Sequence, residues 1–262
     1  MALTTKLVWG LAKSVAKSVA TWIRKAIPKV KYILKKTKPT IRAASKLATI
    51  LNEGRKITRD SASVTIQRSE DSPAKQERRA RFHLDLIELV VWSQVVHRFS
   101  NNIEIHAAHL NTHFQTLQNM VGMLALSHNN HEAVTNTVDY INKVVTELKN
   151  SDSLTNLSIP ELQSPELPPK AAHISIENQY KAFELTREVL AVEVKDFKET
   201  LTAQLRKAEQ LSSTAIALLG PHDQLTRWIN KDVLTSIKAV RDKTNDLRFA
   251  IKDLPQITIT GK

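Results

Sequence analysis

Histidine is the residue type whose number and spacing in this chain most directly suggest chemistry. Seven of the nine histidines lie between His83 and His131. His106, His109 and His113 have the i, i+3, i+7 spacing that places side chains on one face of a helix. His109 and His113 could pair as metal ligands, but no acidic or thiol partner lies at a suitable spacing. We therefore expect no metal site.

Three histidines, His106, His113 and His131, fall on a predicted apolar seam, which suggests a second role for them. A neutral imidazole can be buried in such a seam, whereas burial penalises the imidazolium. They are therefore candidates for a pH switch in which acidification loosens the helix. The alternative is that they are polar residues that set the register of the helix, as a buried Asn does in coiled coils.

Catalytic motifs are missing from the sequence. It contains no Cys, no Gly-rich phosphate loop, no HExxH motif and no nucleophile elbow. The carboxylates of Asp85 and Glu88 lie too near the predicted seam to suggest acid–base work. We predict that the protein is not an enzyme and that it uses no cofactor and no small-molecule substrate.

Positive charge is concentrated in the first quarter of the chain. Residues 1–60 contain 15 Lys and Arg and two acids, a net charge of +13, whereas the other residues carry 23 basic and 24 acidic side chains, a net charge of −1. Such a division indicates a basic arm for an anionic surface, attached to a nearly neutral body.

The arm has the pattern of an amphipathic helix. Apolar residues recur at intervals of three or four from Val8 to Ala26, and basic residues occupy the opposite face. Tryptophan at the boundary of a basic helix suits the headgroup layer of a bilayer. We therefore predict that the arm binds an anionic membrane. The residues expected to contact it are Lys6, Trp9, Lys13, Val15, Lys17, Val19, Trp22, Arg24 and Lys25.

Three alternatives for the arm stay open. Its apolar face could dock on the rest of the protein or on a second copy. Its charge could serve nucleic acid, although nucleic-acid arms are usually richer in Arg and poorer in large apolar residues. It could also be a mitochondrial presequence, because the first 52 residues contain no acid. No stretch is long and apolar enough to span a bilayer and no secretory signal fits, so we expect peripheral membrane association of an otherwise soluble protein.

Several breaks are expected in the first 80 residues. Pro28 should kink or end the first helix, and Gly54 should end a second helix. Residues 61–80 have the composition of a linker. Within this linker, the alternating stretch Val64–Ile66 could pair with residues 257–259 as a small ribbon.

The clearest pattern is a heptad repeat over residues 81–150. With Phe82 at position a, most a and d positions are apolar in one register as far as Leu148. Residues 84–96 are apolar on more sides than a two-helix seam needs, which indicates burial in a bundle or insertion into lipid. Residues 127–130 (Ser-His-Asn-Asn) are the expected weak point of this helix.

A second apolar seam runs through residues 175–254, after a Pro-punctuated loop at 151–174. We expect a break at Gly220-Pro221 and a C-terminal tail at 255–262. The two heptad stretches have similar lengths, so an antiparallel hairpin could bury both seams. The sequence therefore predicts an all-α fold, a long antiparallel helical hairpin or coiled coil with a basic amphipathic N-terminal helical arm.

The combined prediction is an oligomeric, membrane-binding helical protein that perturbs membranes by forming pores or by penetration. In outline this layout is similar to those of α-helical pore-forming toxins and of penetration proteins of non-enveloped viruses, a likeness of architecture without a shared motif. The alternative is a structural coiled-coil component of a larger assembly whose basic arm binds nucleic acid or an acidic partner. The expected partners are thus an anionic membrane and a second copy or another coiled coil, with nucleic acid as the second choice.

Overall fold

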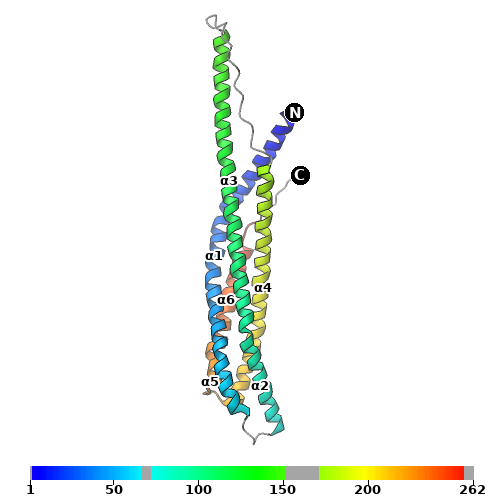
Figure 1. Ribbon diagram of the computed structural model, residues 1–262, viewed down its shortest axis with the longest axis vertical. Helices are drawn as coiled ribbons and strands as arrows, with labels where there is room; N and C mark the ends of the chain where they lie inside the picture. The colour runs from blue at the N-terminus through cyan, green and yellow to red at the C-terminus, as the bar shows by residue number, and fades with distance from the viewer. Residues whose placement is uncertain (1, 67–71, 151–170, 257–262) are drawn as a thin grey trace. The chain divides into compact units, whose positions relative to one another are not determined.

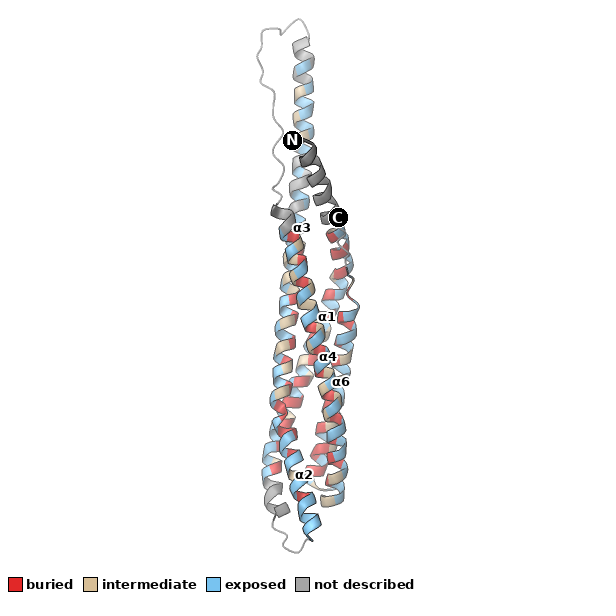
Figure 2. Ribbon diagram, turned by 90° about the vertical axis from the view of Figure 1, so that its right-hand side faces the viewer, coloured by how far each residue is buried: buried red, intermediate tan, exposed pale blue. Residues whose placement is uncertain are grey.

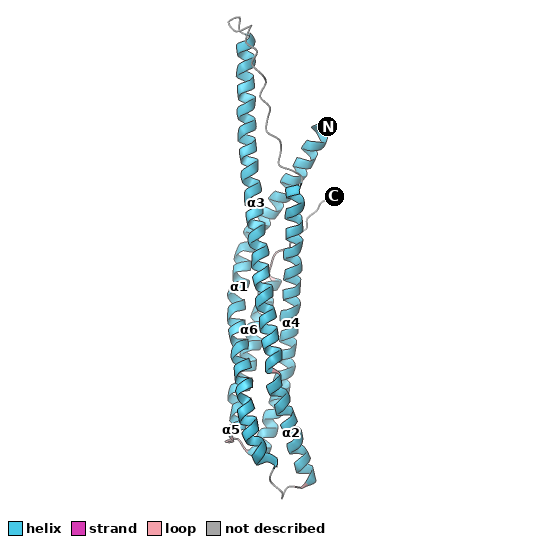
Figure 3. Cartoon of the chain, viewed as in Figure 1, coloured by secondary structure: helices cyan, strands magenta, loops and turns pink. Residues whose placement is uncertain are grey.

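The computed structural model describes residues 2–66, 72–150 and 171–256, and these residues are almost entirely helical, without a strand (Figure 3). The predicted all-α fold is therefore confirmed. The elements are α1 (Ala2–Ile66), α2 (Pro73–Val91), α3 (Ser93–Asn150), α4 (Ala171–Leu219), α5 (Gln224–Arg227), the π-helical turn η1 (Trp228–Val233) and α6 (Leu234–Lys252) (Figure 1).

Two compact units make up the chain. Unit 1 draws on the ranges Met1–Arg24, His113–Phe183 and Gln256–Lys262. Unit 2 draws on Lys25–Thr112 and Glu184–Pro255. Helices α1, α3 and α4 each contribute residues to both units.

In unit 2, α2 and α3 run antiparallel to α4. Asn102 Nδ2 on α3 donates a hydrogen bond to Glu193 Oε1 on α4 over 3.1 Å. A second bond joins α4 to α2: Lys207 Nζ, which follows Glu193 on α4, donates to Glu88 Oε1, which precedes Asn102 in the chain. Residue numbers therefore rise along α2 and α3 as they fall along α4, which is the antiparallel order expected of the two heptad stretches. The two-stranded coiled-coil geometry of the hairpin stays a prediction.

Helices α2 and α3 bury a broader face than a single seam. In unit 2 the a positions are buried, from Phe82 to Leu110, and the e positions Leu86, Ser93, Ser100 and Ala107 are buried as well. Between residues 84 and 96, Val90 and Trp92 are buried in addition to these two rows, and so broad a buried face packs against more than one neighbour. Unit 2 is thus a multi-helix bundle, which agrees with bundle burial of residues 84–96.

Helix α1 is part of this bundle. Its residues at three- and four-residue intervals are buried along one side (Figure 2), and they include Ala26, Val30, Ile33, Ala44, Leu47 and Leu51. On its flank, Lys29 forms an ion pair at 3.6 Å with Asp253, the residue that follows α6, and Lys36 forms one at 2.8 Å with Asp246 of α6. These pairs place α6 antiparallel to α1.

The first helix does not end at Pro28, one of the two outcomes expected of this residue. Both Pro28 and Pro39 lie inside α1, which continues to Ile66. A proline in a helix interior costs about 3 kcal/mol, through a lost hydrogen bond and a steric clash with the preceding turn. Burial of Ala26 and Val30, on either side of Pro28, supplies packing that offsets this cost.

Gly54 does not end a helix either. Helix α1 passes through Gly54, and a Cβ atom there would overlap with the indole ring of Trp228. Glycine is therefore present for close helix packing. Because Val64–Ile66 belongs to the same helix, the proposed ribbon is also wrong, and its other segment, 257–259, lies outside the described residues.

The remaining boundaries differ in detail from those expected. The stretch 61–80 contains the end of α1 and the start of α2, with Pro73 as the first residue of α2. The long heptad helix is interrupted at Trp92, a single turn residue between α2 and α3. Residues 127–130 are helical within α3, without a break.

The predicted break after α4 is confirmed. Gly220 has a φ of +90°, a left-handed conformation that glycine adopts at low cost. The chain then re-enters a helix at Asp223, whose carboxylate accepts a hydrogen bond from the Leu225 backbone N–H at 2.8 Å. From there, Val233, Ile237 and Val240 continue the buried side into α6.

Candidate cationic interface

The core of unit 1 contains two of the residues predicted to contact a membrane. The Trp22 indole is 3% exposed and lies edge-on to the rings of Phe114, Tyr180 and Phe183, with centroids 5.9, 5.2 and 5.2 Å away. Val19, one turn earlier, is fully buried. In this structure both residues serve the core, which favours the alternative that the apolar face of the arm docks on the protein itself.

The polar residues of the same stretch lie at the surface. Lys17, Arg24 and Lys25 are exposed. Lys6, Trp9, Lys13 and Val15 belong to helix α1, but their side chains are outside the part of the chain that the structure describes. Of the nine predicted contact residues, three are therefore positioned to meet an external anionic surface, and two are not.

A longer row of cations follows on α1 in unit 2. These residues, at intervals of three or four, occupy one side of the helix within about 80° of rotation. All five are exposed, and none forms an ion pair with a described residue. We call them the α1 cationic face, and they are Lys31, Lys35, Lys38, Arg42 and Lys46.

The spacing of the α1 cationic face is present in the sequence, but the predicted amphipathic stripe ends at Ala26, before this face begins. What only the structure shows is that Ile33, Thr37, Thr40 and Ala44, on the other side of α1, are buried. The rotation of the helix about its axis is thereby set, and the cations have to point outward.

Lys36 lies beside this face and is paired. Its ammonium donates a hydrogen bond to Asp246 Oδ2 at 2.8 Å, and this bond raises the pKa of Lys36 above 10.5. The ammonium also lies 5.4 Å from the centroid of the Tyr32 ring. Lys36 thus serves the contact between α1 and α6 and is not counted among the free cations.

The seam histidines are half-buried. In unit 1, Gln179 Nε2 lies 2.8 Å from His113 Nδ1, and this contact makes Nδ1 the acceptor and leaves the ring proton on Nε2. In unit 2, the rings of His106 and His109 approach with centroids 6.5 Å apart. His131 lies in α3, and its side chain is outside the described part. The role of Gln179 was not predicted, because nothing in its local sequence marks it as a partner of a distant histidine.

An apolar stripe remains uncovered on α2. Leu84, Ile87 and Val91 have i, i+3, i+7 spacing and are 66, 43 and 49% exposed. Leu86 and Leu89, on the other side of the same helix, are buried. The apolar excess predicted for residues 84–96 is therefore only partly used by the bundle.

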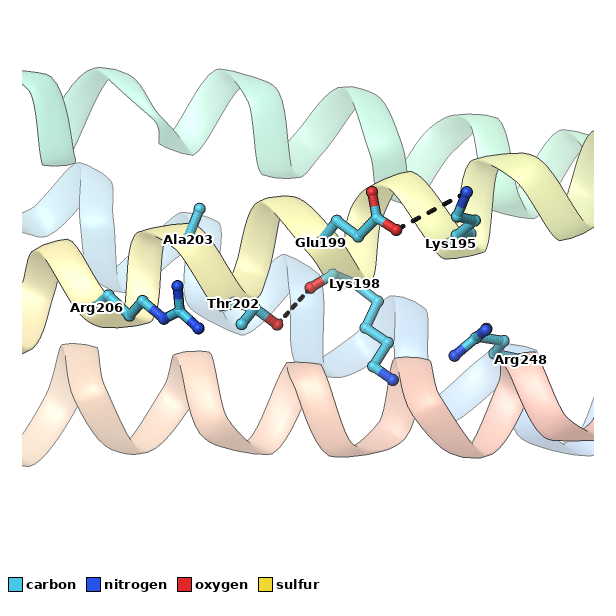
Figure 4. A pocket seen from close by; sticks show the side chains of 7 residues that line it. All are labelled: Lys195, Lys198, Glu199, Thr202, Ala203, Arg206 and Arg248. Atoms are coloured by element: carbon cyan, nitrogen blue, oxygen red, sulfur yellow. Dashed lines mark hydrogen bonds and ion pairs between the residues drawn. The ribbon is translucent and has the colours of Figure 1, made fainter.

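A second group of cations lines a hollow between α4 and α6 in unit 2. Lys195, Lys198 and Arg206 come from α4 and Arg248 comes from α6 (Figure 4). The hollow has a volume of about 250 Å³. Sequence reasoning missed this group because its members come from helices that are separated in the chain.

No protein-family model, curated protein or solved structure matches this chain. Burial, charge and helix geometry therefore carry the functional argument.

Within the described ranges, no helix contains a stretch that is long and apolar enough to cross a membrane. The same ranges contain no group of three or more His, Asp or Glu side chains placed to hold a metal ion. The exposed cations are the feature with an evident capacity to bind a partner.

Proposed function

We propose that the protein binds anionic membrane surfaces peripherally, through the α1 cationic face. The observation that carries this proposal is the row of five exposed, unpaired cations from Lys31 to Lys46 on a helix whose opposite side is buried. At 1.5 Å per residue the row is about 22 Å long, long enough to meet several lipid headgroups.

The energetics of such a row favour a surface over a single small ligand. Each Lys or Arg near an anionic leaflet contributes about 1 kcal/mol, and the attraction falls off within a Debye length. A packed helix holds its cations in place before binding, so little backbone entropy is lost on contact. Binding should therefore depend on several cations together and weaken as salt is added.

Insertion into the bilayer needs a second step in this proposal. Trp22 and Val19 are buried in unit 1, so lipid contact by these two residues requires that they leave their core. We propose that surface binding comes first, and that pore-forming or penetration-type perturbation follows only when unit 1 opens. The uncovered stripe of Leu84, Ile87 and Val91 would then serve oligomerisation.

The surface-binding step can be tested by co-sedimentation with vesicles of phosphatidylcholine, with and without phosphatidylserine. The triple variant Lys35→Glu/Lys38→Glu/Arg42→Glu should lose binding to the anionic vesicles. The matched control, Lys75→Glu/Arg78→Glu/Arg81→Glu, makes the same charge change at exposed positions of α2 and should retain most of the binding. Equal loss in both variants would show that binding depends on net charge alone, and it would contradict a specific role of the α1 cationic face.

The opening step has its own test. A variant that keeps Trp22 and replaces Trp9, Trp92 and Trp228 with Phe reports on Trp22 alone. If unit 1 opens on the membrane, brominated lipids should quench its fluorescence after binding. Bound protein with an unquenched Trp22 would limit the function to surface attachment.

Nucleic-acid binding is the second candidate, and one observation favours it. The described apolar side of α1 is largely buried and the outward side carries the row of cations, and charge is what contact with a phosphate backbone needs. In that case the chain would be a structural component of an assembly. Tight binding to RNA or DNA with a steep salt dependence, and none to anionic vesicles, would favour this candidate over the first.

A further inference from the structure

The hollow between α4 and α6 has a charge pattern that differs from that of the neighbouring helix contact. Helix α6 meets α1 through the complementary pairs Lys36–Asp246 and Lys29–Asp253. Helix α6 meets α4 in antiparallel order, as the ion pair of Lys238 with Glu209 at 3.7 Å shows.

Four cations and one carboxylate line the hollow. Glu199 lies 3.9 Å from Lys195, at the limit of an ion pair, and both side chains are mostly exposed. Lys198, Arg206 and Arg248 form no ion pair with any residue in the described ranges. The lining therefore has a net charge of +3.

The cations converge on the hollow from two helices. Figure 4 shows the Lys198 side chain reaching from α4 toward α6, where the guanidinium of Arg248 lies. Arg206 and Thr202 lie further along the same side of α4. Like charges held close together repel each other, so an anion between them would be favoured by each of the cations.

The chemistry of the lining selects the kind of anion. A guanidinium offers a planar fork of N–H donors that matches two phosphate oxygens, and an ammonium adds a point charge. A volume of about 250 Å³ accommodates one or two phosphate groups but not an extended chain. The α1 cationic face, in contrast, is a row along one side of a helix and suits a surface.

We propose that the α4–α6 hollow binds a phosphate group of a small multivalent phosphate ligand, with Lys198, Arg206 and Arg248 as its main contacts. This site is separate from the α1 cationic face and does not depend on the membrane proposal. Two sources share this ligand chemistry, a soluble phosphate compound and a phosphorylated lipid headgroup.

Pyrophosphate is a suitable first probe for the full-length chain. Calorimetric titration should show saturable binding to the wild type and at least a tenfold loss of affinity in Lys198→Gln/Arg248→Gln. The matched control Arg78→Gln/Arg81→Gln removes the same charge from exposed positions of α2 and should leave pyrophosphate binding unchanged. No saturable binding to the wild type, or equal losses in the two variants, would overturn the proposal.

Thermal melting gives a second readout that a folding defect cannot imitate. Without ligand, Lys198→Gln/Arg248→Gln should melt at or above the wild-type temperature, because it removes repulsion between like charges. Pyrophosphate should raise the melting temperature of the wild type but not that of the variant. A variant that melts well below the wild type would show that the cations are structural and would contradict an anion site.

The source of the phosphate group is distinguished by presenting one headgroup in two forms. If the ligand is soluble, a free inositol polyphosphate should bind. Vesicles that contain the corresponding phosphoinositide should then bind no more tightly to the wild type than to the Lys198→Gln/Arg248→Gln variant. If it is a lipid, the phosphoinositide vesicles should bind more tightly, and the Lys198→Gln/Arg248→Gln variant should lose that gain. Binding of neither form would exclude this class of phosphate ligand.

Discussion

The indole of Trp22 and the ring of Phe183 meet edge to face, with centroids 5.2 Å apart and planes inclined at 78°. Phe183 is fully buried, and Trp22 is nearly so. The contact ties the start of α1 to α4 within unit 1. A residue with the sequence features of a membrane anchor is thus part of an aromatic core, and any role at a membrane has to begin from this state.

Removal of the Trp22 ring should destabilise the protein strongly. Trp22→Ala deletes a buried indole and leaves a cavity, so we expect a loss of about 3–5 kcal/mol in the free energy of unfolding of unit 1. Phe249→Ala, at a ring that is 55% exposed on α6, should cost much less. Chemical denaturation followed by circular dichroism compares the two, and similar costs would contradict a core role for Trp22.

Gly54 and Gly122 make a matched pair of helical glycines. In Gly54→Ala the new methyl group would overlap with the Trp228 ring, so we expect a loss of about 1–3 kcal/mol despite the better helix propensity of Ala. In Gly122→Ala nothing lies within 4 Å of the new Cβ, so a gain of about 0.5–1 kcal/mol is expected. Thermal melts of both variants provide the measurement. A neutral Gly54→Ala would show that α1 and η1 do not pack this closely in solution.

The contact between His113 and Gln179 should contribute to the packing of α3 on α4 in unit 1. Gln179 Nε2 lies 2.8 Å from His113 Nδ1. The variant Gln179→Leu removes the amide donor, so we expect a loss of about 1 kcal/mol in the free energy of unfolding. Chemical denaturation followed by circular dichroism measures this loss.

A second variant separates the hydrogen bond from the loss of packing. Gln179→Leu should cost less in a His113→Leu background, because the acceptor ring is already gone. If Gln179→Leu costs the same in both backgrounds, the contact between these two side chains does not contribute to stability.

The pair of Lys36 and Asp246 should act at alkaline pH. The hydrogen bond to Asp246 raises the pKa of Lys36 above 10.5 in the folded protein. The stability that this pair provides is therefore fully present below the pKa of the unfolded chain and is lost as the pH rises through the higher pKa of the folded state. Asp246→Asn should melt below the wild type at pH 9, and this difference should shrink above pH 10.5. A difference that stays constant across that range would rule out the linkage.

The sequence by itself determined the class of fold and the a positions of the heptad helix, whereas the described d positions are buried only at Trp92 and the e positions are buried in their place. Phe82, Leu89, Val96 and Ile103 recur every seven residues, and all four are buried as predicted. A helix has a fixed period, so the positions of its apolar residues define one face without any knowledge of the partner. The break at Gly220 was equally local, because only the conformation of that residue matters there.

What the tertiary structure decided is which surface covers each of those faces. The stripe that contains Val19 and Trp22 would have the same periodicity if its partner were a lipid or another helix. Its partner in this state is shown only by the contacts of Trp22 with Phe114, Tyr180 and Phe183. Packing also overrode local signals at Pro28 and Gly54, since burial along α1 outweighs the helix-breaking tendency of single residues. The cationic hollow between α4 and α6 exists only because Lys198 and Arg248, separated in the chain, are brought together by antiparallel packing.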